Sequence, residues 1–426
     1  MTELFAHRQK ILRFLTTDSL ALFTGVSEET WQRNLRWLDR SGLALPLAAR
    51  FEALRPGATV PARVRAELQR RLLDNHSRME RMLAFLHDAT QALNAAGVHY
   101  CCVKGFSLIP DCFDGMRERH QVDLDFLIAP KNVNSACSAI EALGYRMQRF
   151  SASGEMRFIK PWKRHIGANG YLYQLPEAPP IEFHTRLWEA EPDEIEFQSL
   201  SMYPDQAEVH EVCGVEFPRL RPAYHFVYLL LHIFRHLLGS WTRLLGLWEV
   251  ATFIRARRDC DELWEEAARL IGNDRRLASV CALVLGLVDV AFPPDMPEAL
   301  REIYAGNLSS DSALWLDRCA TAWLLADPPG NKLNLLVQKQ FWTDRDIWRR
   351  YLRRRLLPLR TPPRLSDEAV QPARIALVYR AEELLYQATR TWYHLKSDFT
   401  YLAALTRWTR RKRLGNRSVY QIADGV

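Results

Sequence analysis

The sequence contains no two cysteines separated by two residues, although eight cysteines are scattered through its 426 residues. A zinc ribbon is therefore not expected. No run of eighteen apolar residues occurs either, and the nearest approach, 277–292, includes Asp289 and predicts a buried helix. Because we find neither an N-terminal secretory segment nor paired cysteines, we expect reduced thiols and a cytoplasmic location. We see no internal repeat.

The composition is that of a globular chain, with 48% hydrophobic and 25% charged residues and enough length for two or three domains. The formal net charge is +7 at pH 7, and the isoelectric point is about 9.0. This excess of positive charge suits an anionic substrate or surface but does not choose among them.

Changes of pattern along the chain predict four regions. Residues 1–96 form a helical region, 97–220 an α+β core, 221–345 a helical domain and 346–426 a basic helical tail. Within the core, one helix is expected over 133–143, between short apolar runs that glycines and prolines separate. The strands predicted from these runs cover 98–103, 122–128, 145–150, 156–159, 164–166, 171–174 and 181–185, with more near 207–217. The fold class is therefore α+β, with a mostly antiparallel or mixed sheet.

The run V-D-L-D-F-L-I at Val122–Ile128 is the most informative part of the sequence. Its branched and aromatic residues predict a strand, and alternation places Asp123 and Asp125 on the same face. Two adjacent carboxylates repel each other, and a hard cation with oxygen ligands relieves that repulsion. The pair predicts a divalent-metal site for phosphate chemistry, although an exposed edge strand would show the same pattern.

Upstream, an apolar run ends at Lys104 and Gly105, and Ser107 follows. Gly105 permits close backbone approach, and residues 106–113 are expected to open a helix whose free N–H groups would bind phosphate beside the Lys104 charge. An ordinary strand-to-helix turn with a surface lysine would show the same sequence pattern. Arg119, four residues before Asp123, would hold a phosphate or orient a carboxylate, unless it is a solvated loop arginine.

A third carboxylate is expected from the run P-P-I-E-F-H-T, where alternation places Glu182 and His184 on one face. Glu182 would ease deprotonation of an acceptor hydroxyl, or merely pair with an arginine such as Arg186. His184 would contact acceptor or phosphate, or hydrogen-bond within the sheet. Glu155 and Asp114 are weaker candidates for the third acid. His165 is a further candidate substrate contact.

His232 and His236 are four residues apart in an apolar helical run, which puts both on one face as zinc enzymes require. The glutamate beside the first histidine is missing, however, and no clear third ligand follows. A packed pair is therefore favoured over a zinc site. In the tail, two arginine-rich clusters at 349–364 and 407–417 are interleaved with aromatic residues. They predict either a contact with nucleic acid or an anionic membrane, or a solvated helix face.

Four parts of the sequence together resemble the signature of a nucleotidyltransferase family found in bacterial polysaccharide and peptide gene clusters. These parts are Lys104–Gly105, Arg119, Asp123–Leu127 and the run Ile181–His184. That largely uncharacterised family belongs to the polymerase-beta-like superfamily. The resemblance covers roughly 43–270, although Phe106 separates the glycine from the serine of the turn. It also extends to the histidine region, where Arg243 and Glu249 occupy matching places.

The resemblance implies transfer of a nucleoside monophosphate from a nucleoside triphosphate, with ATP as the expected nucleotide, to a hydroxyl or phosphate acceptor. Asp123, Asp125 and Glu182 would hold two Mg²⁺ ions, or Mn²⁺. Lys104, Gly105, Ser107, Arg119 and His184 would contact the nucleotide. The alternatives are a catalytically inactive binding module, which docks on nucleic acid, membrane or a partner enzyme, and a metal hydrolase that uses the two helical histidines.

Overall fold

The structure is a computed structural model that describes residues 3–150, 155–160, 172–173, 178–190, 193–197, 200, 206–239, 242–358 and 373–423. The chain forms two compact units, Met1–Pro329 and Gly330–Val426. The predicted strand at 164–166 and His165 lie outside the described residues. The predicted division into four regions stays a prediction.

The first unit begins with helices that bury aromatic side chains. Trp31 and Trp37 are completely buried in the second of these helices, where Ser27 caps the N-terminus and Gly42 ends the helix with a φ of 81°. The last helix of the predicted helical region is a single helix of 34 residues. The helices are α1 (Glu3–Thr17), α2 (Glu28–Ser41), α3 (Ala44–Leu54) and α4 (Ala62–Ala95).

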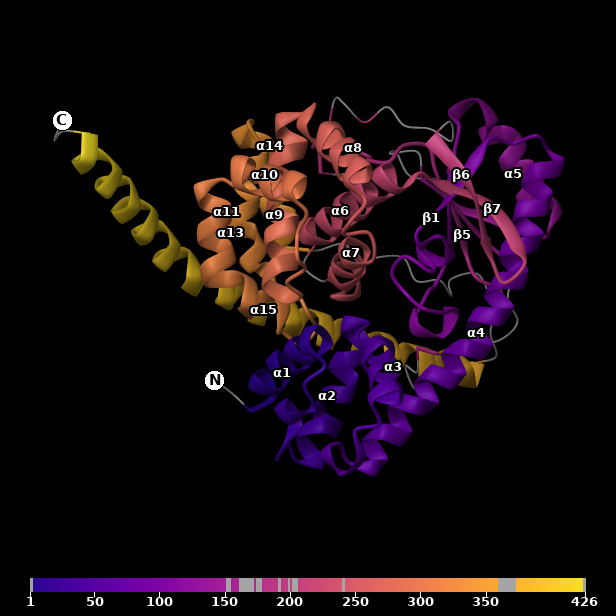
Figure 1. The fold of residues 1–426 in the computed structure, drawn as a ribbon, viewed down its shortest axis with the longest axis horizontal. Coiled ribbons are helices and arrows are strands. Elements are labelled where there is room, and N and C mark those ends of the chain that lie inside the picture. Colours follow the sequence, from indigo (N-terminus) through magenta and orange to yellow (C-terminus); the bar gives the residue numbers. More distant parts are fainter. Residues whose placement is uncertain are drawn as a thin grey trace. The chain divides into compact units, whose positions relative to one another are not determined.

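The sheet of this unit contains seven strands in the order β3-β4-β5-β2-β1-β7-β6 (Figure 1). Strand β2 pairs in parallel with β5 and β1 in parallel with β7, whereas the other neighbours are antiparallel. The fold is therefore α+β with a mixed sheet, as the sequence predicts. The strands are β1 (Tyr100–Val103), β2 (Leu124–Ile128), β3 (Arg146–Phe150), β4 (Met156–Ile159), β5 (Ile181–His184), β6 (Ala207–Val212) and β7 (Val215–Leu220).

The two faces of the central strands differ in chemistry. One face carries Phe126, Phe158 and Phe183, and the ring of Phe183 contacts each of the other two. Helices α4 and α5 (Val133–Ala142) lie beside the sheet (Figure 1). The opposite face carries Asp125 and Glu182, which alternation along β2 and β5 separates from those rings. The sheet thus has an aromatic face and a carboxylate face.

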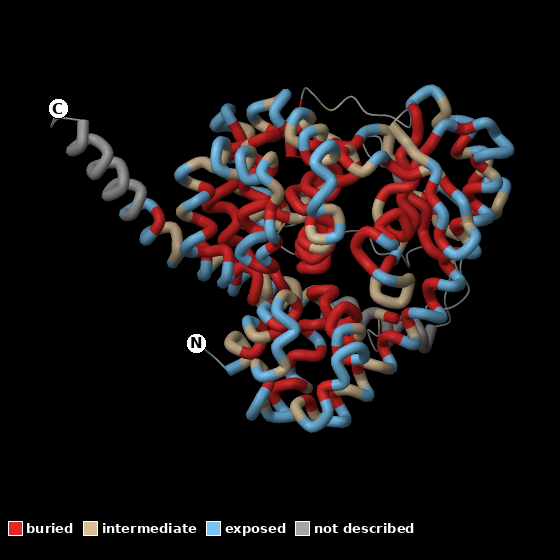
Figure 2. Tube along the Cα trace, viewed as in Figure 1, coloured by how far each residue is buried: buried red, intermediate tan, exposed pale blue. Residues whose placement is uncertain are grey.

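Helices follow the sheet and cover its carboxylate face. The first of them, α6, is buried along nearly its whole length (Figure 2), and its Tyr228 packs in one cluster with Cys101, Val103 and Leu127 of the sheet. The helices are α6 (Pro222–Leu238), α7 (Leu245–Ala256), α8 (Asp261–Gly272), α9 (Arg275–Ala291), α10 (Glu298–Asn307), α11 (Ser310–Trp315) and α12 (Thr321–Leu324), with a π-helical turn at Leu316–Ala320.

The second unit is helical, with α13 (Leu335–Gln338), α14 (Arg345–Leu356) and α15 (Ala373–Ala423). Lys332 is completely buried in it and donates from Nζ to Oδ1 of Asp398 in α15 at 2.7 Å. Three arginines end α14, and Arg355 lies over the ring of Tyr351. Arg360 and Arg364, which the sequence singles out, lie outside the described residues.

Three predicted elements differ from the structure. Strand β2 begins at Leu124 rather than Val122, so Asp123 lies immediately before it. Of the strand predicted at 171–174, the described residues 172 and 173 lie in a turn. Instead of a helix over 106–113, the chain forms a short 3₁₀ turn at Gly105–Leu108.

Pro110 explains why no helix continues from that turn. A proline lacks an N–H and restricts the residue before it, and Ile109 is accordingly extended. The free helix N-terminus expected for phosphate binding is therefore absent from residues 105–113.

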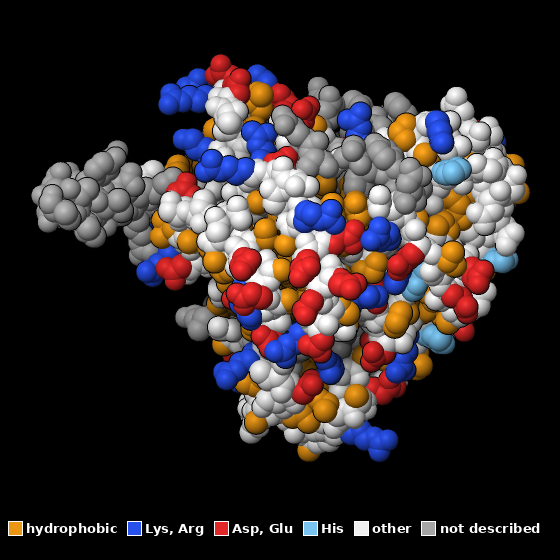
Figure 3. Space-filling view, turned by 45° about the horizontal axis from the view of Figure 1, so that its top comes forward, with side chains coloured by type: hydrophobic (Ala, Val, Ile, Leu, Met, Phe, Trp, Pro, Cys, Tyr) orange, Lys and Arg blue, Asp and Glu red, His pale blue; other side chains and the backbone are white. Residues whose placement is uncertain are grey.

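No helix among the described residues has both the length and the apolar character to cross a membrane. On the face drawn in Figure 3, acidic and basic side chains are interspersed rather than segregated. The net positive charge is therefore not gathered into a single field on that face.

Candidate active site

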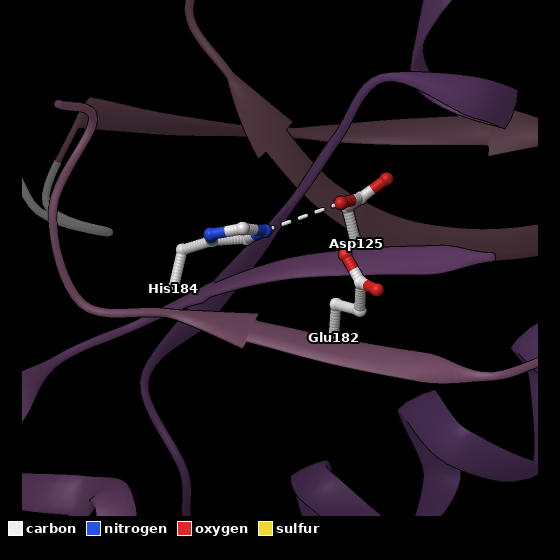
Figure 4. A group of neighbouring side chains, drawn as sticks. All are labelled: Asp125, Glu182 and His184. Carbon is white, nitrogen blue, oxygen red and sulfur yellow. Dashed lines mark hydrogen bonds and ion pairs between the residues drawn. The ribbon is translucent and has the colours of Figure 1, made fainter. Parts of the chain in front are cut away.

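The carboxylate face brings together Asp125, Glu182 and His184 (Figure 4). Asp125 and Glu182 are paired residues of the parallel strands β2 and β5. Each of the three side chains offers a ligand atom, and these atoms lie within 4.8 Å of one another. Asp125 and Glu182, which are more than fifty positions apart in the sequence, thus meet because β2 and β5 are neighbours in the sheet.

Two cationic groups contact the carboxylate of Asp125. Lys104 donates from Nζ to Oδ1 at 2.9 Å, and His184 Nε2 lies 3.2 Å from the same oxygen. Burial opposes ionisation of Asp125, but these partners outweigh it and lower the pKa of Asp125 below its ordinary value. Burial likewise opposes protonation of His184, and the bonds to Asp125 and Glu189 raise its pKa to about 9. Asp125 is therefore ionised and His184 protonated near neutral pH.

Asp123 differs from its neighbour because its carboxylate makes no hydrogen bond or ion pair to any described residue. It is nevertheless half-buried. Burial and the nearby charge of Asp125 raise the pKa of Asp123, against the weaker opposing influence of Lys104. A half-buried carboxylate beside a second one, without a direct partner, is a group that a bound cation would stabilise.

Glu182 accepts a hydrogen bond from Arg157 Nη1 at 2.7 Å. Arg157 belongs to β4 and lies opposite Glu182 in the antiparallel register. Burial, followed by the charges of Asp123 and Asp125, raises the pKa of Glu182 to about 7 despite this arginine. A carboxyl group with a pKa near neutrality can both accept and release a proton under physiological conditions.

The turn after β1 has an unusual backbone. Lys104 has φ 61° and ψ −169°, a conformation that is strained for any residue with a Cβ and costs on the order of 1–3 kcal/mol. Gly105 follows with φ 57°, and a Cβ there would collide with the side-chain amide of Gln121. Gly105 thus has a positive φ with the Gln121 side chain packed against it, and the Lys104 ammonium reaches Asp125.

Besides Lys104 and His184, two more of the predicted nucleotide contacts make internal bonds. Ser107 is completely buried and donates from Oγ to the carbonyl oxygen of Lys104 at 2.7 Å. Arg119 donates from Nε to Oε1 of Glu249 at 2.7 Å. Arg119 thus orients a carboxylate, which is one of the two functions that its position suggested.

His232 and His236 lie in α6 with their Nε2 atoms 3.2 Å apart, so one imidazole donates to the other. Burial and the charge of Lys104 lower the pKa of both, that of His236 to about 4. The described residues place no third ligand with them, because the potential metal group contains Asp125, Glu182 and His184 instead. The structure matches the packed pair that the sequence favours.

Sequence reasoning missed Arg157 and Glu189. Arg157 was recognisable only as one polar residue of a short predicted strand, and its role depends on which strand lies beside it. Glu189 Oε1 lies 3.7 Å from His184 Nδ1, and the chain leaves the sheet between these two residues. Neither contact has a signal in the local sequence pattern.

Comparison with known proteins agrees with the chemistry of this face. A family model described as an uncharacterised nucleotidyltransferase matches residues 27–285. A solved structure with similarity is the solution structure of the antibiotic-resistance factor ANT(2″)-Ia, with 11% identity, a TM-score of 0.31 and coverage of 46% of this chain and 94% of that chain. That likeness is too weak to bear on activity. No curated protein matches the chain.

Proposed function

The chain belongs to the family of uncharacterised nucleotidyltransferases, and on this premise we propose that it moves a nucleoside monophosphate from a nucleoside triphosphate to an acceptor. The acceptor group is a hydroxyl or a phosphate, and ATP is the expected nucleotide. Membership of this family makes the chain a nucleotidyltransferase. The use of a metal ion, the identity of the nucleotide and the roles of individual residues are what we propose.

The observation that carries the proposal is the pairing of Asp125 with Glu182 across parallel strands, with Asp123 at the entrance of β2. Three carboxylates on one face repel one another, and burial raises the pKa of two of them. Such a group is poorly stable alone and well suited to hard divalent cations.

The donor set fits Mg²⁺ or Mn²⁺ through its oxygens. Asp123, Asp125 and Glu182 would hold the ions, whereas His184 is protonated and serves better as a partner of Asp125 than as a ligand. Bound there, Mg²⁺ would neutralise charge on the reacting phosphates. Lys104 lies close enough to Asp125 to direct its ammonium to the same phosphates.

Glu182 is the proposed proton acceptor. As the acceptor oxygen bonds to the α-phosphorus, the bond from that phosphorus to the bridging oxygen breaks and pyrophosphate leaves. The hydroxyl proton passes to an oxygen of Glu182, which is paired with Asp125 across the parallel strands. Arg157 holds this carboxylate in place.

The test is release of pyrophosphate from each of the four common nucleoside triphosphates with Mg²⁺, using purified protein and a panel of hydroxyl and phosphate acceptors. Changing Asp123→Asn and Asp125→Asn together should abolish release, since both charges toward the metal are lost. An exposed carboxylate changed in the same way, Asp259→Asn, is the control. Activity of the double variant equal to that of the unchanged protein would contradict the assignment of these residues.

A further inference from the structure

Helix α4 reaches from the N-terminal helices to the segment that leads into β2. Asn75 donates from Nδ2 to the carbonyl oxygens of Arg117 and Arg119, each at 2.9 Å. One turn later, Arg78 donates from Nη1 to the carbonyl oxygen of Gln121. The bonded carbonyls belong to alternate residues of a single segment, and both helical side chains are buried. One face of α4 thus clamps residues 117–121.

Gln121 extends this clamp to the active site. Its side chain donates from Nε2 to the carbonyl oxygen of Asp123 at 2.6 Å. The same side chain occupies the space where a Cβ at position 105 would lie. Gln121 therefore holds the backbone of Asp123 against the Lys104–Gly105 turn, and the position of Gln121 is itself fixed by Arg78.

The clamped segment carries Arg119 and ends at Asp123. The Asp123 side chain has no direct partner among the described residues, so only its backbone fixes its place beside Asp125. We propose that Asn75 and Arg78 are positioning residues, which hold Asp123 and Arg119 where nucleotidyl transfer needs them. This inference rests on the proposed function, and it gives helix α4 a part in supporting the proposed active site.

Stability alone does not account for an arginine at position 78. The guanidinium is buried and forms no ion pair with a described carboxylate, and its Nε has no hydrogen-bond partner. Burial and the nearby Arg243 lower the pKa of Arg78 to about 10, while the charge of Asp123 acts in the opposite direction. A methionine would fill much of this space without the cost of burying a charge. The arginine is explained if its bond to Gln121 serves the site.

The experiment compares Asn75→Ala, Arg78→Met and Arg78→Lys with Arg81→Met, the same chemical change at an exposed position of α4. Hydrogen exchange of residues 117–123, Mn²⁺ binding by calorimetry, kcat and KM are measured on the full chain. We expect Asn75→Ala and Arg78→Met to speed exchange in that segment while β1 and β2 stay protected. We expect kcat to fall by about 10- to 100-fold, because small displacements of reacting groups are costly, with little change in KM. Arg78→Lys should retain part of the protection from hydrogen exchange and part of kcat.

Unchanged exchange and unchanged Mn²⁺ binding in Asn75→Ala and Arg78→Met would overturn the inference. So would a loss of kcat in these variants no larger than in Arg81→Met. If Asn75→Ala does not fold, the comparison of Arg78→Met with Arg78→Lys decides. Absence of pyrophosphate release from the unchanged protein would instead refute the proposed function, while exchange and Mn²⁺ binding would still test the clamp.

Discussion

The two faces of the central strands carry side chains of opposite chemistry on the same backbone. On the aromatic face, Phe126 and Phe183 are completely buried against other apolar groups. On the carboxylate face, one position along, Asp125 and Glu182 concentrate like charges. Neighbouring residues of one strand therefore contribute separately, one set to the free energy of unfolding and the other, in the proposed function, to catalysis. Breaking each face in turn tests that separation.

The largest effect is expected from Glu182→Gln, which removes the proposed proton acceptor without changing its shape. We expect kcat to fall by about 10²- to 10⁴-fold, the usual contribution of general base catalysis. The free energy of unfolding should stay the same or increase, because a buried charge beside two others is lost. Steady-state kinetics and urea unfolding of the same preparation measure both. A large loss of stability would show that the faces are not separable.

The adjacent substitution Phe183→Ala should show the reverse. Removing a completely buried phenylalanine leaves a cavity and should lower the free energy of unfolding by about 3–5 kcal/mol. Under conditions where the variant is fully folded, kcat should remain within a few-fold of the unchanged protein. Denaturant unfolding measures the loss, and a value below about 1 kcal/mol would contradict the assigned packing.

Metal binding should stabilise the carboxylate face selectively. With Mn²⁺ at about 100 times its dissociation constant, the unfolding free energy should rise by about 2.7 kcal/mol, and EDTA should reverse the gain. Asp125→Asn should remove the gain, whereas Phe183→Ala should retain it from a lower starting value. Thermal unfolding with and without the ion gives the answer, and an equal gain in Asp125→Asn would place the ion elsewhere.

The smallest effect concerns pH. The folded pKa of Glu182 is about 7 against an ordinary 4.5, so the folded state binds the extra proton between these values. Its contribution to stability is present below pH 4.5 and is lost as the pH rises through 7. In EDTA, the unchanged protein should therefore lose on the order of 2 kcal/mol relative to Glu182→Gln between about pH 5 and pH 8. Parallel pH profiles of the two proteins would refute the raised pKa.

Alternation within a strand made the site residues partly predictable. Because a strand has a period of two, the order of residues alone groups Asp125 with Asp123 and Glu182 with His184. Which strands are neighbours cannot be read from that period. Arg157 becomes relevant only through the pairing of β4 with β5, and no local pattern specifies that register.

Other parts of the site depend on tertiary contacts that the sequence does not record. Asn75 and Arg78 are two polar residues within a long helical pattern, and nothing local distinguishes them from solvated positions. Ser107 is a plausible phosphate contact by residue type, yet its hydroxyl closes the turn on Lys104. Helical patterning, in contrast, predicted helical regions on either side of the sheet in the sequence, and the structure has the long helices α4 and α6 there.

The buried Lys332 of the second unit has a consequence for shortening the chain. Its ammonium is completely enclosed, and Asp398, near the middle of α15, provides its only carboxylate partner among the described residues. A truncated protein that stops before Asp398 would leave this ammonium without its counter-ion, at a cost of about 3–5 kcal/mol. The C-terminal helix therefore cannot be trimmed back to α14 without disturbing the unit, whereas a stop codon beyond Trp408 would spare this pair.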